Sequence, residues 1–302
     1  MPITDTTAPQ NNTAELEKPS KEVQGTNLDT AYFRSFSDIP NAKVVSELVH
    51  APEAMVQRIQ DEGLENTIPI IPYFEARYKA LDALITQRGI TQVVEFAAGR
   101  TTRGLNNPQW NYIYTDQDLN SLNQMKGVAK QLLTDQNASK LPFVRFDAIT
   151  GEGLEEVMEL LNDDKVAIIH EGLITYYGLE TKAKIALNAK KILERFGGIY
   201  ATPDVHTKSF RSDILALNTN MEQRERNRSK RVGRDLSTLR FEDKESAAKF
   251  YSELGFKVTT HKFGELVPKL SSSEALIQDP EKLALVNKTM LENREIWEMT
   301  LP

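Results

Sequence analysis

The chain of 302 residues contains no cysteine and only 4 histidines. The lack of cysteine excludes disulfides, zinc–thiolate sites and cysteine nucleophiles. No stretch approaches the roughly 18 consecutive apolar residues that a membrane span needs. Positively charged residues are in the minority, with 37 Lys and Arg against 43 Asp and Glu. The resulting net charge of −6 argues against general affinity for nucleic acids. The first residues also lack the basic start and apolar core of a secretory signal, so we expect a cytoplasmic protein.

The segment 91–105 combines a short apolar strand with a turn of very small residues. Its apolar residues suit a buried strand that ends at Glu95. The turn that follows is Ala97-Ala98-Gly99, whose minimal side chains let the backbone turn tightly and approach a ligand closely.

A second predicted strand, Tyr112–Thr115, is followed by Asp116. An acid at this position can hydrogen-bond a ribose diol, which indicates a nucleoside-containing cofactor. Nicotinamide and flavin binders normally seat a pyrophosphate on a Gly-x-Gly-x-x-Gly turn, but this turn has one glycine in that register and carries Glu95 just before it. A carboxylate there repels a pyrophosphate and suits a cationic cofactor such as S-adenosylmethionine. From this stretch alone, a turn that binds no cofactor remains an alternative.

Residues 93–105 resemble the first motif of the leucine carboxyl methyltransferase-like branch of class I S-adenosylmethionine-dependent methyltransferases, which includes polyketide-type O-methyltransferases. That motif runs from a hydrophobic strand through Gly-Ala-Gly and Asp-Thr-Arg to a later Leu. This chain has Ala97-Ala98-Gly99 and Thr101-Thr102-Arg103 in those places. The segment His170–Tyr177 is similar to the family's Glu-Gly-Leu segment after the fourth strand, and Arg77–Asp82 resembles its Arg-x-x-x-x-Asp helix. The three segments keep the family's order and spacing.

The alternation of strands and helices predicts an α/β fold with a doubly wound, mostly parallel sheet. The resemblance adds that the sheet is Rossmann-like and is closed by an antiparallel hairpin of the last two strands. The predicted strands are Gln92–Phe96, Tyr112–Thr115, Pro142–Arg145, Val166–His170, Gly198–Thr202, Phe256–His261 and Glu295–Leu301.

We predict three parts along the chain. Residues 1–26 have few large apolar side chains and are expected to be a disordered tail. Residues 27–90 form a cap of helices, and residues 91–302 form the methyltransferase core, with a basic insert at about 205–243.

Four acids follow four successive predicted strands, at the edge of the sheet where open α/β proteins bind ligands: Glu95, Asp116, Asp147 and Glu171. We therefore predict a shared cofactor site. The resemblance implies that Asp116 binds the ribose, that Asp147 and Ala148 bracket the adenine, and that Glu171 lies near the cofactor's ammonium group. Arg77 and Arg103 would pair with its carboxylate. Ala97 and Gly99 complete the predicted site.

The predicted reaction is an in-line displacement, for which the protein mainly aligns the acceptor. A carboxylate acceptor needs no base, whereas a hydroxyl does. His206, after the fifth predicted strand, is the first candidate for such a base, and His170 is the second. A purely structural histidine remains the alternative for each.

A basic cluster lies in the insert: Arg224, Arg226, Arg228, Lys230 and Arg231. It carries no apolar stripe, so packing does not predict it. Two interpretations are open, a solvated helix or a lid that attracts an anionic acceptor.

We therefore expect an S-adenosylmethionine-dependent methyltransferase that methylates an oxygen, carboxyl or hydroxyl, of a small molecule, with an anionic acceptor as one option. No nucleic-acid partner, membrane or metal site is expected. An NAD(P)-dependent oxidoreductase on a Rossmann sheet and a non-catalytic cofactor-binding protein with a decayed methyltransferase site are the alternatives. The absent second and third glycines and the closing hairpin count against the oxidoreductase.

Overall fold

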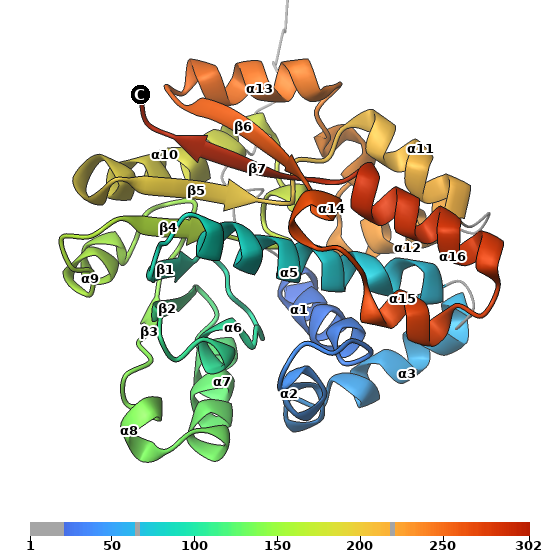
Figure 1. Cartoon of the computed structure of the whole chain (residues 1–302), viewed down its shortest axis with the longest axis horizontal. Helices are drawn as coiled ribbons and strands as arrows, with labels where there is room; N and C mark the ends of the chain where they lie inside the picture. Colours follow the sequence, from blue (N-terminus) through green and yellow to red (C-terminus); the bar gives the residue numbers. More distant parts are fainter. Residues whose placement is uncertain (1–20, 64–66, 218–220) are drawn as a thin grey trace, which may run out of the picture.

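A computed structural model describes residues 21–63, 67–217 and 221–302, which are built around one seven-stranded sheet (Figure 1). The strand order is β3-β2-β1-β4-β5-β7-β6. Strands β1 to β5 are parallel, and β7 runs antiparallel to both β5 and β6. The bounds are β1 Gln92–Glu95, β2 Asn111–Asp116, β3 Phe143–Arg145, β4 Val166–Ile169, β5 Gly198–Thr202, β6 Lys257–Lys262 and β7 Glu295–Thr300. The predicted doubly wound, mostly parallel fold and its strands are confirmed.

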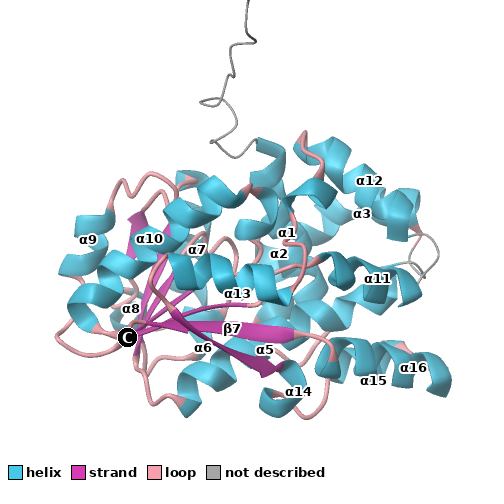
Figure 2. Cartoon of the chain, turned by 90° about the horizontal axis from the view of Figure 1, so that it is seen from above, coloured by secondary structure: helices cyan, strands magenta, loops and turns pink. Residues whose placement is uncertain are grey.

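The central strands are buried on both faces, as expected for parallel strands covered by helices (Figure 2). One face packs on α9 (Leu154–Glu159), α10 (Leu179–Phe196) and α13 (Lys244–Glu253). The other packs on α5 (Ile71–Gln87) and α7 (Leu119–Leu132). The short helices α6 (Arg103–Asn106) and α8 (Asp135–Ala138) complete the connections around β2 and β3.

The junction from α10 to β5 depends on two glycines. Gly197 ends α10 with a φ of 66°, a left-handed conformation that favours glycine. A Cβ on Gly198 would lie 2.0 Å from the Val166 carbonyl oxygen, so only glycine lets β5 pair this closely with β4.

The N-terminal helices are α1 (Lys21–Arg34), α2 (Ala42–Leu48) and α3 (Ala51–Glu62), followed by α5. The expected tail of residues 1–26 is corrected in part, because α1 already begins at Lys21, whereas residues 1–20 lie outside the described residues. Ala31 and Phe33 are buried against neighbouring helices. Once such packing holds one end of a helix, each added residue gains a hydrogen bond at little further cost. The division into cap and core stays a prediction, and α5 of the expected cap packs on the sheet.

The C-terminal region adds helices that the sequence pattern did not predict: α11 (Lys208–Leu217), α14 (Phe263–Leu266), α15 (Ser271–Leu276) and α16 (Pro280–Asn287). The basic insert contains α12 (Met221–Val232), and a helix there is one of the two open interpretations. The last two strands pair as predicted, but α14 to α16 separate them, so they are not a tight hairpin. Together with α1 to α3, helices α11, α12, α15 and α16 gather beyond the carboxyl ends of the parallel strands (Figure 1). No helix in the described residues is long and apolar enough to cross a membrane.

Candidate cofactor and acceptor site

The turn after β1 and the acid after β2 meet at the carboxyl edge of the sheet. The Gly99 backbone N–H donates to Asp116 Oδ2 at 3.1 Å, and the Asp118 N–H donates to Asp116 Oδ1 at 2.9 Å. Asp116 is nearly buried, and this burial raises the pKa of its carboxyl to about 6 against the effect of those two hydrogen bonds. Each carboxylate oxygen accepts one bond and has room for another. Asp116 can therefore receive the two hydroxyls of a ribose.

Ala97 occupies a backbone conformation that glycine prefers. Its φ is 49°, in the left-handed region, which costs a residue with a Cβ about 1–2 kcal/mol. Ala97 stands where the resembled motif has its first glycine, so the substitution has kept the turn and added strain. The next N–H, of Ala98, donates to the Thr115 carbonyl oxygen at 2.8 Å and ties the turn to β2.

Asp147 and Ala148 follow β3 in a turn of their own. Asp147 Oδ1 accepts from the Ile149 N–H at 2.8 Å, and the Ala148 carbonyl oxygen accepts from Asn188 Nδ2 at 3.0 Å. Both residues lie at the same sheet edge as Asp116, which is where the predicted adenine-binding role requires them. The role itself stays a prediction.

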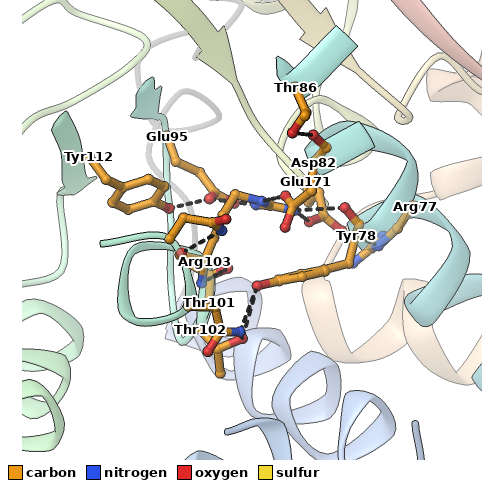
Figure 3. A network of polar contacts seen from close by, with 12 residues as sticks. Arg77, Tyr78, Asp82, Thr86, Glu95, Thr101, Thr102, Arg103, Tyr112 and Glu171 are labelled. Atoms are coloured by element: carbon orange, nitrogen blue, oxygen red, sulfur yellow. Dashed lines mark hydrogen bonds and ion pairs between the residues drawn. The ribbon is translucent and has the colours of Figure 1, made fainter. Parts of the chain in front are cut away.

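Below the turn, a buried ionic network is centred on Arg103 (Figure 3). The fully buried Arg103 guanidinium is 2.6 Å from both Glu95 Oε2 and Glu171 Oε2, and it also pairs with Asp82. Tyr112 donates its hydroxyl to the same Glu95 oxygen. The network thus joins β1, β2, α5, α6 and the segment after β4.

This network gives Glu95 and Arg103 partners within the chain, where Arg103 is 0% exposed and Glu95 2%. Their predicted cofactor roles stay predictions. Three carboxylates neutralise the Arg103 charge, and Glu95 has Arg103 and Tyr112 as its partners. A buried charge needs such partners, and the acid at the end of β1 finds its cation within the chain.

Glu171 is the branching point toward the N-terminal helices. Its Oε1 lies 2.8 Å from Arg34 Nη2 and 2.9 Å from Arg77 Nε. Burial by itself would raise the pKa of Glu171, but the charges of Arg34, Arg103 and Arg77 outweigh it and lower the pKa to about 2. Arg77 lies at the margin of the network, with its guanidinium carbon 4.6 Å from the Phe74 ring centre and Nη2 near Gly172. The cofactor roles of Arg77 and Glu171 stay predictions.

Helix α1 lies over the glycine turn. A Cβ added to Gly99 would come within 3.0 Å of Asn27 Cβ, and Asn27 also accepts from Arg100. Gly99 has a φ of 56°. A larger residue here would strain the backbone and push on α1, so Gly99 is needed for the fold itself, and its contact with a cofactor stays a prediction.

The candidate base His206 is bonded to an aromatic residue of α5. His206 Nε2 lies 2.9 Å from the Tyr73 hydroxyl. Burial lowers the pKa of His206 well below its usual value; Asp204 opposes this, and the charges of Arg240, Arg294 and Arg228 add to it. His206 is therefore neutral at pH 7, and it is a weak base, because the same burial disfavours its charged form.

The second candidate, His170, is fully buried at the end of β4. Its Nδ1 lies 3.0 Å from Asp204 Oδ2, and its Nε2 lies 2.7 Å from the Tyr200 hydroxyl. Both ring nitrogens have partners inside the protein, which is consistent with the structural interpretation, and a role of His170 as base stays a prediction.

The basic insert is partly packed, which corrects the expectation that packing does not account for it. Arg228 stacks 5.0 Å from the Tyr176 ring centre and donates to the Tyr176 hydroxyl at 2.6 Å. Arg234 lies 5.0 Å from the Tyr177 ring centre and donates to the Tyr176 carbonyl oxygen at 2.7 Å. Arg226 and Lys230 are exposed, and the side chains of Arg224 and Arg231 lie outside the described ones. The insert therefore covers the segment after β4 through cation–π contacts.

The sequence reasoning missed Arg34, Tyr112 and Asp204 as parts of this region. Asp82 and Arg77 carried a signal, since both belong to the helix that resembles the family's Arg-x-x-x-x-Asp motif. Nothing local in the sequence marks Arg34, which reaches Glu171 only through the fold.

No family model matches the sequence, and no curated protein is significantly similar to it. Among solved structures, the chain is similar to the plantazolicin methyltransferase BamL in complex with a desmethylPZN analog and SAH, with 10% identity, a TM-score of 0.42, and 94% of this chain and 100% of that one covered. It is also similar to the glycopeptide N-methyltransferase MtfA (12% identity, TM-score 0.44, 74% and 90% covered). A third is the methyltransferase domain of bacterial CtHen1 (13% identity, TM-score 0.46, 76% and 100% covered). These similarities carry no conclusion about cofactor or acceptor.

The order of the sheet defines the class of fold directly. Five parallel strands in the order β3-β2-β1-β4-β5 continue into the antiparallel β7 and then β6. The chain thus has the Rossmann-like methyltransferase fold that the sequence predicted.

Proposed function

We propose that the protein is an S-adenosylmethionine-dependent methyltransferase that acts on an oxygen of a small molecule. The observation that carries the proposal is the meeting of Gly99 and Asp116 at adjacent strand ends, 3.1 Å apart through a hydrogen bond. This places a backbone turn of small residues beside a carboxylate that can accept two ribose hydroxyls.

The sheet favours this function over an oxidoreductase. A dinucleotide-binding Rossmann sheet has a parallel sixth strand, whereas β7 is antiparallel to β5 here. The turn also lacks the glycines that seat a pyrophosphate, and Ala97 adds a methyl group where the backbone would have to approach it.

Each part of the cofactor has a candidate partner of complementary chemistry at the carboxyl edge of the sheet. Asp116 would hold the ribose, and the turn of Asp147 and Ala148 would flank the adenine. Arg77, at the margin of the ionic network, would hold the carboxylate, and Glu171 would lie near the ammonium. When bound, S-adenosylmethionine supplies an activated methyl group. The protein's part is to orient the acceptor and exclude water.

The acceptor would lie beside β5 and the basic insert. Arg228 and the exposed Arg226 and Lys230 give this side positive charge, which would attract an anionic small molecule. His206, neutral and bonded to Tyr73, is the proposed base for a hydroxyl acceptor.

Calorimetry with the full chain tests the cofactor. We expect S-adenosylmethionine to bind and NADH not to bind. Asp116→Asn should weaken S-adenosylmethionine binding about 10- to 150-fold, the effect of losing hydrogen bonds to a charged group. Asp135→Asn, an exposed acid at the start of α8, is the matched control and should change nothing. Binding of NADH alone would overturn the proposal in favour of the oxidoreductase.

Methyl transfer separates an enzyme from a non-catalytic cofactor-binding protein. The full chain with labelled S-adenosylmethionine and a mixture of small hydroxyl and carboxyl compounds should yield a labelled product. Tight cofactor binding without transfer to any of them would support the decayed-site alternative.

A further inference from the structure

Asp204, just after β5, has one buried carboxylate oxygen without a hydrogen-bond partner in the described part of the chain. The residue is 1% exposed. Its other oxygen, Oδ2, accepts from the Leu173 N–H at 2.9 Å and lies 3.0 Å from His170 Nδ1. Leaving a buried acceptor of a charged group unsatisfied is costly, so the oxygen requires an explanation.

The Asp204 carboxylate is held rigidly from behind. His170, its partner, is fixed by the Tyr200 hydroxyl at 2.7 Å and by Thr202 Oγ1 at 3.1 Å. The Asp204 N–H donates to the same Thr202 oxygen at 3.0 Å. A side chain held by a second layer of hydrogen bonds is typical of a group that positions a ligand.

The carboxylate is also ionised. Burial by itself would raise the pKa of Asp204, but His170, Arg77 and His206 hold it well below the usual range. The free Oδ1 is therefore a pure hydrogen-bond acceptor with negative charge at neutral pH.

The position of Asp204 in the sheet places it on the acceptor's side. The proposed cofactor residues follow β1, β2, β3 and β4, and Asp204 follows β5, the next parallel strand along the same edge. The charge of Asp204 contributes to the pKa shifts of Tyr73, His206 and Arg228, which would lie beside the proposed acceptor.

We propose that Asp204 Oδ1 receives a hydrogen bond from the methyl acceptor's own nucleophilic group. That group then carries a hydrogen and is a hydroxyl or an amine, not a carboxylate, because a second carboxylate would meet like charge in a buried place. The inference rests on the proposed methyltransferase function, excludes a carboxylate acceptor and admits an amine beside the hydroxyl. For a hydroxyl, whose single hydrogen goes to Asp204, it replaces His206 as the group that receives that hydrogen. It also gives the unpartnered oxygen its missing donor.

Three probes that share one ring system test the class of acceptor: 2-naphthol, 2-naphthylamine and 2-naphthoate. Calorimetry with S-adenosylhomocysteine comes first, and failure of that ligand to bind would overturn the proposed function and this inference with it. With S-adenosylhomocysteine bound, we expect 2-naphthol or 2-naphthylamine to bind at least about tenfold more tightly than 2-naphthoate. Equal or tighter binding of 2-naphthoate, or binding of none, would overturn the inference and leave the proposed function intact.

Asp204→Asn supplies the second arm. In this variant, the preference for 2-naphthol or 2-naphthylamine over 2-naphthoate, measured as the ratio of their affinities, should fall about tenfold or more. The affinity for S-adenosylhomocysteine should stay unchanged. Glu298→Gln is the matched control, since Glu298 is also a buried carboxylate bonded to a histidine, His261 at 2.6 Å, but lies on β7 with Arg88 as a further partner. It should keep the preference. A folded Asp204→Asn protein that keeps it would refute the inference, and the wild-type comparison decides alone if that variant does not fold.

Discussion

Removing the cation at the centre of the ionic network tests whether the network stabilises the fold. Arg103→Met would leave Glu95 buried with Tyr112 as its remaining partner, whereas Glu171 keeps Arg34 and Arg77. Breaking a buried pair by removing one partner costs about 3–5 kcal/mol. That is a large share of the roughly 5–15 kcal/mol by which domains are stable. The midpoint of urea unfolding at pH 7 should fall accordingly.

The loss of stability in Arg103→Met should also depend on pH in a direction that can be predicted. Burial already raises the pKa of Asp82 to about 6 against the effect of Arg103, and without Arg103 it should rise further, so ionised Asp82 destabilises the variant and protonation removes that cost. The loss relative to wild type should therefore shrink as the pH falls from 7 to 5. In the wild type, Glu171 acts oppositely, because its pKa is lowered to about 2, and its contribution is lost only as the pH falls toward that value.

Two further proteins sharpen this test. Arg145→Met removes an exposed pair with Glu152, 3.2 Å long, and should cost at most about 1 kcal/mol with little dependence on pH. Adding Glu95→Gln to Arg103→Met should recover part of the loss, because both partners are then uncharged. If Arg103→Met unfolds with the same midpoint as Arg145→Met at pH 7, the reasoning about the network is refuted.

Three other predictions concern the site. Ala97→Gly should raise the free energy of unfolding by up to about 1 kcal/mol, because it relieves the positive φ but gives the unfolded chain more freedom; a lower melting temperature would contradict the strain. Binding of S-adenosylmethionine should weaken as the pH falls below 6, since the pKa of Asp116 is raised to about 6 and its acid form can accept fewer ribose hydroxyls. Calorimetry between pH 5 and 8 checks this, and an affinity that does not change with pH would count against Asp116 as the ribose-binding residue. The rate of methyl transfer should show no inflection near pH 6.5, because the pKa of His206 lies well below that value. If His206 is the base, His206→Asn should slow transfer to a hydroxyl acceptor about 10²–10⁴-fold. An unchanged rate would exclude His206 as the base.

The sequence predicted what depends on local pattern and strand order. Short segments with apolar centres located the strands, and the topology that follows from them placed Gly99 beside Asp116. The sequence did not predict which charges pair in the interior. Nothing in the sequence pairs Glu95 with Arg103, because that contact forms only when α6 packs beside β1.

The same limit applies to the basic insert and to Asp204. A row of arginines predicts a charged surface, and only the fold shows that Arg228 and Arg234 lie on tyrosines of the segment after β4. The sequence does not predict a role for Asp204, because the property that distinguishes it is an oxygen without a hydrogen-bond partner in the described residues, and this depends on the fold.

The two outer strands of the sheet bear on how the protein avoids self-association. An edge strand offers unpaired backbone groups to other chains, and natural proteins protect such edges with charge or with short strands. At one edge, β6 reads Lys-Val-Thr-Thr-His-Lys and carries a lysine at each end. At the other, β3 is only three residues long. The fold therefore presents two edges that discourage aggregation, although its wide parallel sheet forms from contacts distant in sequence and leaves strands exposed while it folds.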